Sequence, residues 1–283
     1  MVLALGVDVG ASRKGLDVVL LDDDRRPVRI ASKVAIERLG LLIGEVRPDV
    51  IAIDAPPAWA PSGSSRLTER LLAEVNIHAF NTPAARAGHG HPFYAWMEVG
   101  FEAFAVAAAR GYPRYRAGAP RGTAMEVFPH GSAAVLAGCL PPKGVRKKAW
   151  RERILTAHGI PVAELTTADR VDAALCALTG LLALEGRRFA PGDPKEGVIV
   201  LPVASLPAHP YRPAPDEAHD EATIPLFREC ACGDPACHEL TRTEFAPGHD
   251  AKRKSRLWAN ARTGTAAIEE LRRRGWAIPP EMR

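Results

Sequence analysis

Two short apolar segments that each end in an aspartate constrain the fold of this chain most strongly. Val2–Val7 runs into Asp8, and Val50–Ile53 runs into Asp54. Apolar runs of this length, rich in Val, Leu and Ile, predict buried strands. A carboxylate beside such a strand is costly unless a positive charge lies near it. We therefore expect the second strand to return beside the first, so that both acids meet at one site.

The segments between these two runs predict the order of the elements. Residues 16–21 and 28–34 are predicted strands, and the short polar turns before them favour antiparallel hairpins. Residues 35–46 carry Ile, Leu and Val on one helical face. Three antiparallel strands, a helix and a returning strand predict an α/β fold with a mixed sheet, in which later strands are parallel.

Residues 55–119 are predicted to be a helical insertion over the site, because a structureless loop of that length is improbable. The insertion carries many Pro and Gly residues and two expected helices, near 65–74 and 93–110. The remaining elements complete a domain over residues 1–202. They are a strand at 123–128, helices near 131–137, 147–158 and 167–186, and a late strand at 197–202.

Composition places the chain among ordinary globular proteins. Of its 283 residues, 47% are hydrophobic and 25% are charged. No stretch approaches the roughly 18 consecutive apolar residues that span a bilayer. The N-terminal segment lacks a basic leader before Asp8, so we expect no signal peptide and a cytoplasmic protein.

The C-terminal part is predicted to be a separate module. Residues 203–228 are rich in Pro, Ala and acids, as is typical of a linker, and residues 229–283 form a small basic module. From residue 242 to the end there are ten Lys or Arg and five Asp or Glu. This tail either attracts a polyanion or is an ordinary solvated surface.

Further acids follow in the later elements. Glu126 lies in the strand at 123–128, and Asp169 and Asp172 have the i, i+3 spacing that places two side chains on one helix face. Carboxylates are the ligands that Mg²⁺ and Mn²⁺ prefer, and two-metal phosphodiester cleavage needs them from separate elements. Asp8, at a rigid strand end, is the expected bridging ligand, and Asp54 on the neighbouring strand is the expected second ligand.

Three of these acids also have an ordinary structural interpretation. Asp54 could end its strand in a turn, because Asp favours such positions. Asp169 could be a first-turn acid that the helix dipole favours. Glu126 could pair with a basic residue such as Arg121 or Lys14. The functional interpretation depends on the joint pattern.

Four short blocks resemble the domain-of-unknown-function family 429, which is described as predicted RNase H-like nucleases. The blocks are Gly6–Gly10, Ile51–Pro56, Met125–Pro129 and Asp169–Ala173. The last block also resembles the Asp-x-x-Asp-Ala helix of RuvC-type Holliday junction resolvases, which share the fold. The resemblance spans about residues 1–190. It implies an RNase H-like domain and a metal-dependent nuclease, with Asp8, Asp54, Asp169 and Asp172 as ligands of Mg²⁺ or Mn²⁺ and Glu126 as an added catalytic acid.

Two other functions remain open at this point. Asp8–Lys14 also resembles the first phosphate loop of actin-like sugar kinases, which need a second nucleotide-binding domain with Gly-rich loops. No clear Gly-Gly or Gly-x-Gly segment follows a late strand here. The other alternative is a non-catalytic nucleic-acid-binding protein on an RNase H-like scaffold.

Basic residues supply candidates for substrate binding. Arg86 lies among polar residues of the insertion, and a basic run from 143 to 153 could bind a nucleic-acid backbone without reading its sequence. A solvated loop and a charged helix face are the ordinary alternatives. The candidate substrate-binding residues are Lys14, Arg86, Lys147 and Lys148.

A cluster of cysteines predicts a structural zinc site in the C-terminal module. Three thiols and a histidine can close a tetrahedral site, and Gly233 and Pro235 supply turns between them. The cluster and the downstream Phe245–Lys252 resemble a short zinc-ribbon-like tail. His249 is the expected fourth ligand. His238 is the alternative, because it adjoins Cys237 and adjacent residues rarely both reach one ion. The predicted ligands are Cys230, Cys232, Cys237 and His249.

Overall fold

The computed structural model describes residues 1–10, 14–214, 228–229, 240–241, 257 and 265–273. The chain divides into two compact units, Met1–Ile224 and Pro225–Arg283. In the second unit the described elements are β7 (Arg228–Glu229), β8 (Leu240–Thr241) and α9 (Thr265–Arg273), with β7 and β8 antiparallel. The predicted zinc ligands, including His238, lie outside the described residues.

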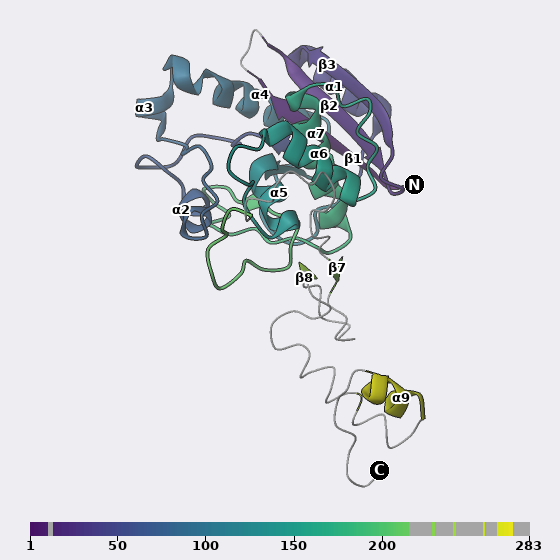
Figure 1. Ribbon diagram of the computed structural model, residues 1–283. Coiled ribbons are helices and arrows are strands. Elements are labelled where there is room, and N and C mark those ends of the chain that lie inside the picture. Colours follow the sequence, from purple (N-terminus) through teal and green to yellow (C-terminus); the bar gives the residue numbers. More distant parts are fainter. Residues whose placement is uncertain (11–13, 215–227, 230–239, 242–256, 258–264, 274–283) are drawn as a thin grey trace. The chain divides into compact units, whose positions relative to one another are not determined.

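One six-stranded sheet organises the first unit (Figure 1), and its strand order is β3-β2-β1-β4-β5-β6. The pairs β1–β2 and β2–β3 are antiparallel, and β1–β4, β4–β5 and β5–β6 are parallel. This is the RNase H-like mixed sheet that the sequence predicts, so the fold class is confirmed. The strands are β1 (Leu3–Val9), β2 (Leu16–Asp22), β3 (Pro27–Val34), β4 (Val50–Asp54), β5 (Ala124–Val127) and β6 (Ile199–Val200).

Helices cover both faces of the sheet. On one face α7 (Ala168–Leu184) packs across β1, β2 and β4, with α5 (Pro129–Ala137) and α6 (Lys147–Ala157) beside it. On the other face α1 (Ile36–Val46) and α4 (Ala95–Ala109) share a core with the opposite side of β1 and β4. Because both faces are covered, β1 and β4 are buried along nearly their whole length.

A glycine lets α7 approach the central strand. A Cβ added at Gly6 would lie 1.9 Å from the Ala173 carbonyl oxygen and 2.4 Å from the Ala177 nitrogen. Only a residue without a side chain permits this spacing. The first turn of α7 is capped by Thr167, whose hydroxyl accepts a hydrogen bond from the Arg170 amide at 3.2 Å. The close approach brings the acids of that turn to the strand that carries Asp8.

The predicted insertion is shorter than 55–119. Helix α4 contributes Ala103, Phe104 and Ala107 to the core beneath the sheet, so it belongs to the domain itself. Its apolar face has small residues that allow this packing. Residues 56–94 supply no side chain to the core that α1 and α4 share with the sheet, and they contain α2 (Leu67–Glu74), α3 (Ala85–Gly88) and the 3₁₀ turn η1 (Pro92–Tyr94).

The predicted domain end at residue 202 and linker start at 203 are also corrected. Tyr211 is buried, and its amide donates to the Val75 carbonyl at 3.0 Å. The Leu140 amide donates to the Arg212 carbonyl at 2.9 Å, and the Ala214 amide donates to the Leu140 carbonyl at 3.0 Å. Residues 203–214 therefore belong to the first unit, because a buried tyrosine and backbone hydrogen bonds attach them to it. Among the described residues, no helix is both long and apolar enough to cross a bilayer.

Candidate active site

Asp8 and Asp54 face each other across the two central strands. They are direct partners in the parallel pairing of β1 and β4, and Asp17 of β2 is the partner of Asp8 on its other side. Side chains alternate between the faces of a strand, so Asp8 projects to the same face as Gly6, the face that α7 covers. The predicted return of the second strand beside the first is confirmed, and it brings both acids to one site.

Burial and mutual repulsion act on these two carboxylates. Burial, followed in effect by the nearby Asp172 and Asp169, raises the pKa of Asp8 to about 8, and Lys14 opposes this shift. Burial also raises the pKa of Asp54 well above its ordinary value, followed in effect by Asp8 and Asp172. No ion pair joins Asp8 or Asp54 to a cation within the described part of the chain. Without a bound cation, Asp8 is therefore largely protonated at neutral pH, and ionising both Asp8 and Asp54 would create negative charge that the surrounding side chains do not neutralise.

The first turn of α7 supplies the other two predicted ligands. The Lys14 ammonium lies 2.7 Å from Asp169 Oδ2, and the Arg151 guanidinium of α6 forms an ion pair with the Asp172 carboxylate. Both acids thus lie where the sequence predicts, at the face that carries Asp8. Burial raises the pKa of Asp172, and Arg151 opposes that shift.

The donor set fits a hard divalent cation, although the present side-chain positions do not form a closed site. Hard carboxylate oxygens without a full complement of positive charge attract Mg²⁺ or Mn²⁺. Among the residues that the structure describes, no group of three or more His, Cys, Asp or Glu side chains is arranged to hold a metal ion. Lys14 and Arg151 engage Asp169 and Asp172, so a cation must compete with them.

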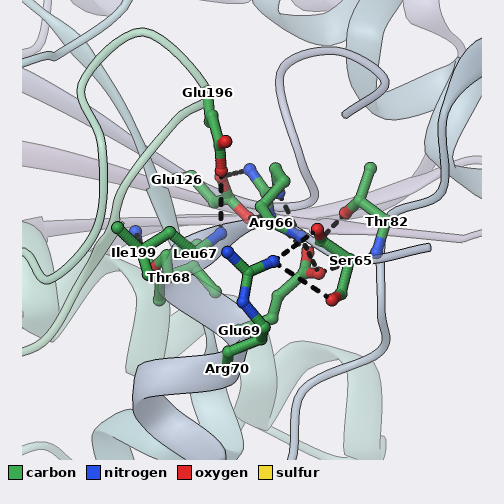
Figure 2. A network of polar contacts seen from close by, with 10 residues as sticks. All are labelled: Ser65, Arg66, Leu67, Thr68, Glu69, Arg70, Thr82, Glu126, Glu196 and Ile199. Atoms are coloured by element: carbon green, nitrogen blue, oxygen red, sulfur yellow. Dashed lines mark hydrogen bonds and ion pairs between the residues drawn. The ribbon is translucent and has the colours of Figure 1, made fainter. Parts of the chain in front are cut away.

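Glu126 is engaged by a buried arginine instead (Figure 2). Arg66 is 1% exposed, and its two terminal nitrogens donate to the two Glu126 oxygens at 2.7 and 2.6 Å. Arg66 also donates to Glu69, whose carboxylate accepts from the amide and hydroxyl of Thr82 at 2.9 and 2.6 Å. The predicted partners Arg121 and Lys14 pair with Asp49 and Asp169. The catalytic role of Glu126 stays a prediction, and its contacts are those of a structural anchor.

Strand register explains why Glu126 does not join the aspartates. Its partner on β4 is Ile53, not Asp54, so the side chain projects to the opposite face of the sheet. Sequence reasoning missed Arg66 and Glu69 because charged residues on a short helix ordinarily face solvent. The available signal was their i, i+3 spacing at the start of a helix.

A cavity of about 780 Å³ opens at this end of the sheet. Asp54, Asp172, Arg66 and Glu126 all line it. Of the predicted substrate-binding residues, Lys14 and Lys147 line the cavity. Lys148 pairs with Glu152 on its own helix, and Arg86 is exposed on α3 away from the cavity lining.

Two cavity residues were not predicted as functional. His130 of α5 lines the cavity with its Nδ1 buried and without a hydrogen-bond partner in the described structure. Burial, Arg151 and Lys147 lower its pKa to about 4, so the ring is neutral at pH 7. Arg151, which the sequence places only in a basic run, contacts Asp172 directly. Neither role has a sequence signal, because each depends on how α5 and α6 pack on α7.

The similarity of this chain to solved structures is weak. Two solved structures are similar to this chain: Thermus thermophilus RuvC in complex with a Holliday junction substrate, and Thermus thermophilus RuvC alone. The first has 15% identity and a TM-score of 0.37, and covers 66% of this chain and 97% of the other. The second has 12% identity and the same TM-score, with 65% and 96% coverage. No curated protein sequence matches the chain.

The family match covers most of the six-stranded sheet. It is to the protein family of unknown function DUF429, and it extends over residues 6–196. That span begins in β1 and ends just before β6, so it contains Asp8, Asp54, Glu126 and α7. The chain belongs to the DUF429 family.

Proposed function

We propose that this protein hydrolyses nucleic-acid phosphodiesters with Mg²⁺ or Mn²⁺. One observation carries the proposal: Asp8, Asp54 and Asp172 come from three elements, are buried to different degrees, and repel one another with too little positive charge between them. A protein keeps such an arrangement at a stability cost. Binding a divalent cation would relieve the repulsion.

The residues that would hold the metal are Asp8, Asp54 and Asp172, with Asp169 beside them. A bound ion supplies an activated water and stabilises the leaving oxygen. The chain's own contribution is to bind and orient the phosphate. Lys14 and Lys147 line the cavity and place positive charge beside the acids, and neutral His130 has a free ring nitrogen at the same wall.

The test is cleavage of labelled single-stranded, duplex, hybrid and branched substrates with Mn²⁺ by wild type and Asp8→Asn. We expect cutting that EDTA stops and that Asp8→Asn lowers by at least about 100-fold. Asp23→Asn is the matched control, because Asp23 is exposed in the β2–β3 turn and lies outside the site. No cutting of any substrate by folded, Mn²⁺-bound protein would refute the proposal.

A second candidate function is nucleic-acid binding without catalysis. The ion pairs Lys14–Asp169 and Arg151–Asp172 favour it, because they neutralise two of the acids without any metal. Under this alternative, Asp8→Asn leaves binding intact and there is no cleavage to lose. The kinase alternative needs a second nucleotide-binding lobe. In the described part of the second unit the only sheet is the β7–β8 pair, two residues in each strand.

We also propose that Cys230, Cys232, Cys237 and His249 bind structural Zn²⁺, with His238 the alternative to His249. The support is the spacing of thiols and histidines in the sequence. Elemental analysis of protein purified without chelator should find about one zinc per chain. Cys232→Ser should remove it, and a zinc content near zero in wild type would contradict the proposal.

A further inference from the structure

We propose that the cavity binds an unpaired nucleotide, with its base against Phe80 and Phe93 and its phosphate toward Lys14, Lys147 and Arg151. This inference rests on the proposed function and names the substrate class of the same site: a single strand, a loop or an extruded nucleotide. The reason is that the cavity joins an exposed aromatic surface to a wall of positive charge.

The aromatic surface consists of Phe80, Phe93 and Trp96, which we call the aromatic rim. All three line the cavity. Phe80 is 64% exposed and Phe93 is 55% exposed, and their ring centroids are 6.0 Å apart at 72°. Trp96 lies 5.9 Å from Phe80. A cluster of solvent-exposed aromatic side chains indicates a binding site, because folding alone would bury such residues.

The backbone beside Phe80 is held in place by the buried ion network. Phe80 lies two residues before Thr82, whose amide and hydroxyl both donate to Glu69. Glu69 and Glu126 are both bound by Arg66, which ties this part of the insertion to β5 (Figure 2). A fixed aromatic platform loses little conformational freedom when a base stacks on it, which favours binding.

Positive charge lines the cavity at Lys14, Lys147 and Arg151. Lys147 is exposed at the cavity, and Lys14 is 52% exposed although it contacts Asp169. The Arg151 Nε is buried and has no hydrogen-bond partner in the described structure, so this arginine keeps a donor unused. Phosphate oxygens accept from such donors. The cations therefore place a phosphate beside the proposed metal ligands.

Size and geometry favour an unpaired base over a duplex. A cavity of about 780 Å³ is in the range that encloses a small organic ligand, which a single nucleotide matches. A base within a duplex has both faces covered by its neighbours, so it cannot stack on Phe80 unless it leaves the helix. Stacking on aromatic side chains together with a basic backbone groove is how single strands are bound without sequence preference.

The experiment measures binding in EDTA, so that cleavage does not interfere. Fluorescence anisotropy compares one labelled 20-nucleotide strand with the same strand in a duplex. We expect the single strand to bind more tightly to wild type, and the double variant Phe80→Ala/Phe93→Ala to lose about tenfold or more in affinity for it. Phe80→Trp should keep the affinity, because it keeps the stacking face.

Leu41→Ala is the matched control. Leu41 is an exposed apolar residue on α1, outside the cavity lining, so its removal should leave the affinity unchanged. Thermal unfolding of every variant checks folding, and the exposed rim residues should change the melting temperature little. An unchanged single-strand affinity in the double variant, or a duplex that binds as tightly as the single strand, would overturn the proposal.

Cleavage with Mn²⁺ then separates this inference from the proposed function. Rim-dependent binding of the single strand without any cleavage supports the nucleotide site and refutes the nuclease. Cleavage by the double variant with unchanged affinity refutes the nucleotide site and leaves the nuclease intact.

Discussion

Two groups of acids lie on or beside neighbouring strands of the sheet, and they differ in how their charge is balanced. Asp8 and Asp54 lie at the ends of β1 and β4 with no ion pair to a cation in the described structure. Glu126 on β5 and Glu69 on α2 share the buried guanidinium of Arg66. Burial raises the pKa of Glu126 too, but there Arg66 opposes the shift directly.

The difference distinguishes a structural ion network from the proposed metal site. Charge that is buried and paired holds elements together, and here it fastens the insertion to the sheet. Charge that is buried and left unpaired destabilises the fold, so its presence indicates a ligand that completes it. The carboxylates of Asp8 and Asp54 are therefore expected to lower stability, whereas the paired carboxylate of Glu126 is expected to hold its network together. Substitutions can measure this contrast.

The largest expected effect comes from breaking the paired network. Arg66→Met leaves Glu69 and Glu126 buried without their cation, and we expect the free energy of unfolding to fall by about 3–5 kcal/mol. Urea unfolding followed by circular dichroism measures it. Arg70→Met on the same helix is the control, because Arg70 is exposed and should change stability by less than about 0.5 kcal/mol. A loss below about 1 kcal/mol in Arg66→Met would show that the network is not structural.

The next effect tests how the aspartates are brought together. Gly6→Ala places a methyl group where the α7 backbone lies, and we expect the free energy of unfolding to fall by about 1–3 kcal/mol. Cleavage should fall as well, because α7 carries Asp169 and Asp172. Gly44→Ala on α1 is the matched control, since its nearest neighbour would be 3.4 Å away. Equal stability of the two variants would contradict the close approach of α7.

The contribution of Asp8 to the stability of the metal-free protein should decrease as pH rises. The pKa of Asp8 is about 8 in the folded protein against 3.8 ordinarily, so the folded state binds more protons between these values. In EDTA, the contribution of Asp8 to stability should therefore be largest below about pH 4 and should decrease as pH rises toward 8.

Asp8→Asn tests this assignment. It should flatten the pH dependence and raise the free energy of unfolding at pH 8 by at least about 1 kcal/mol. Saturating Mn²⁺ should stabilise wild type more than Asp8→Asn. A variant that is less stable than wild type at pH 8 would show that Asp8 is paired in the folded protein.

The smallest expected effect concerns Arg151, a cation that contacts one of the proposed metal ligands. Arg151 balances Asp172 and thereby competes with a metal ion for it. Arg151→Gln should tighten Mn²⁺ binding about threefold to tenfold in titration calorimetry without nucleic acid, and it should lower the stability of the metal-free protein. Arg153→Gln, an exposed residue of the same helix, is the control. Weaker Mn²⁺ binding in Arg151→Gln would mean that Arg151 orients Asp172 for the metal.

Sequence reasoning alone was enough for the sheet and for the positions of the aspartates. The apolar runs before Asp8 and Asp54 predict two buried strands, and short turns predict the antiparallel edge, because periodicity and turn length are local properties. The observed β1–β4 pairing brings the two acids together as predicted. The i, i+3 spacing of Asp169 and Asp172 likewise depends only on the helix.

Tertiary structure decided which acids are paired and with what. Glu126 projects to the opposite face from Asp54 because its partner on β4 is Ile53. No local sequence pattern predicts this register. Arg66 contacts Glu126, which is 60 residues away in the sequence, and Arg151 contacts Asp172, which is 21 residues away. Both contacts depend on how α2 and α6 pack. Whether a buried carboxylate is neutralised depends on these distant partners, so the separation of structural from functional acids emerges only in the folded chain.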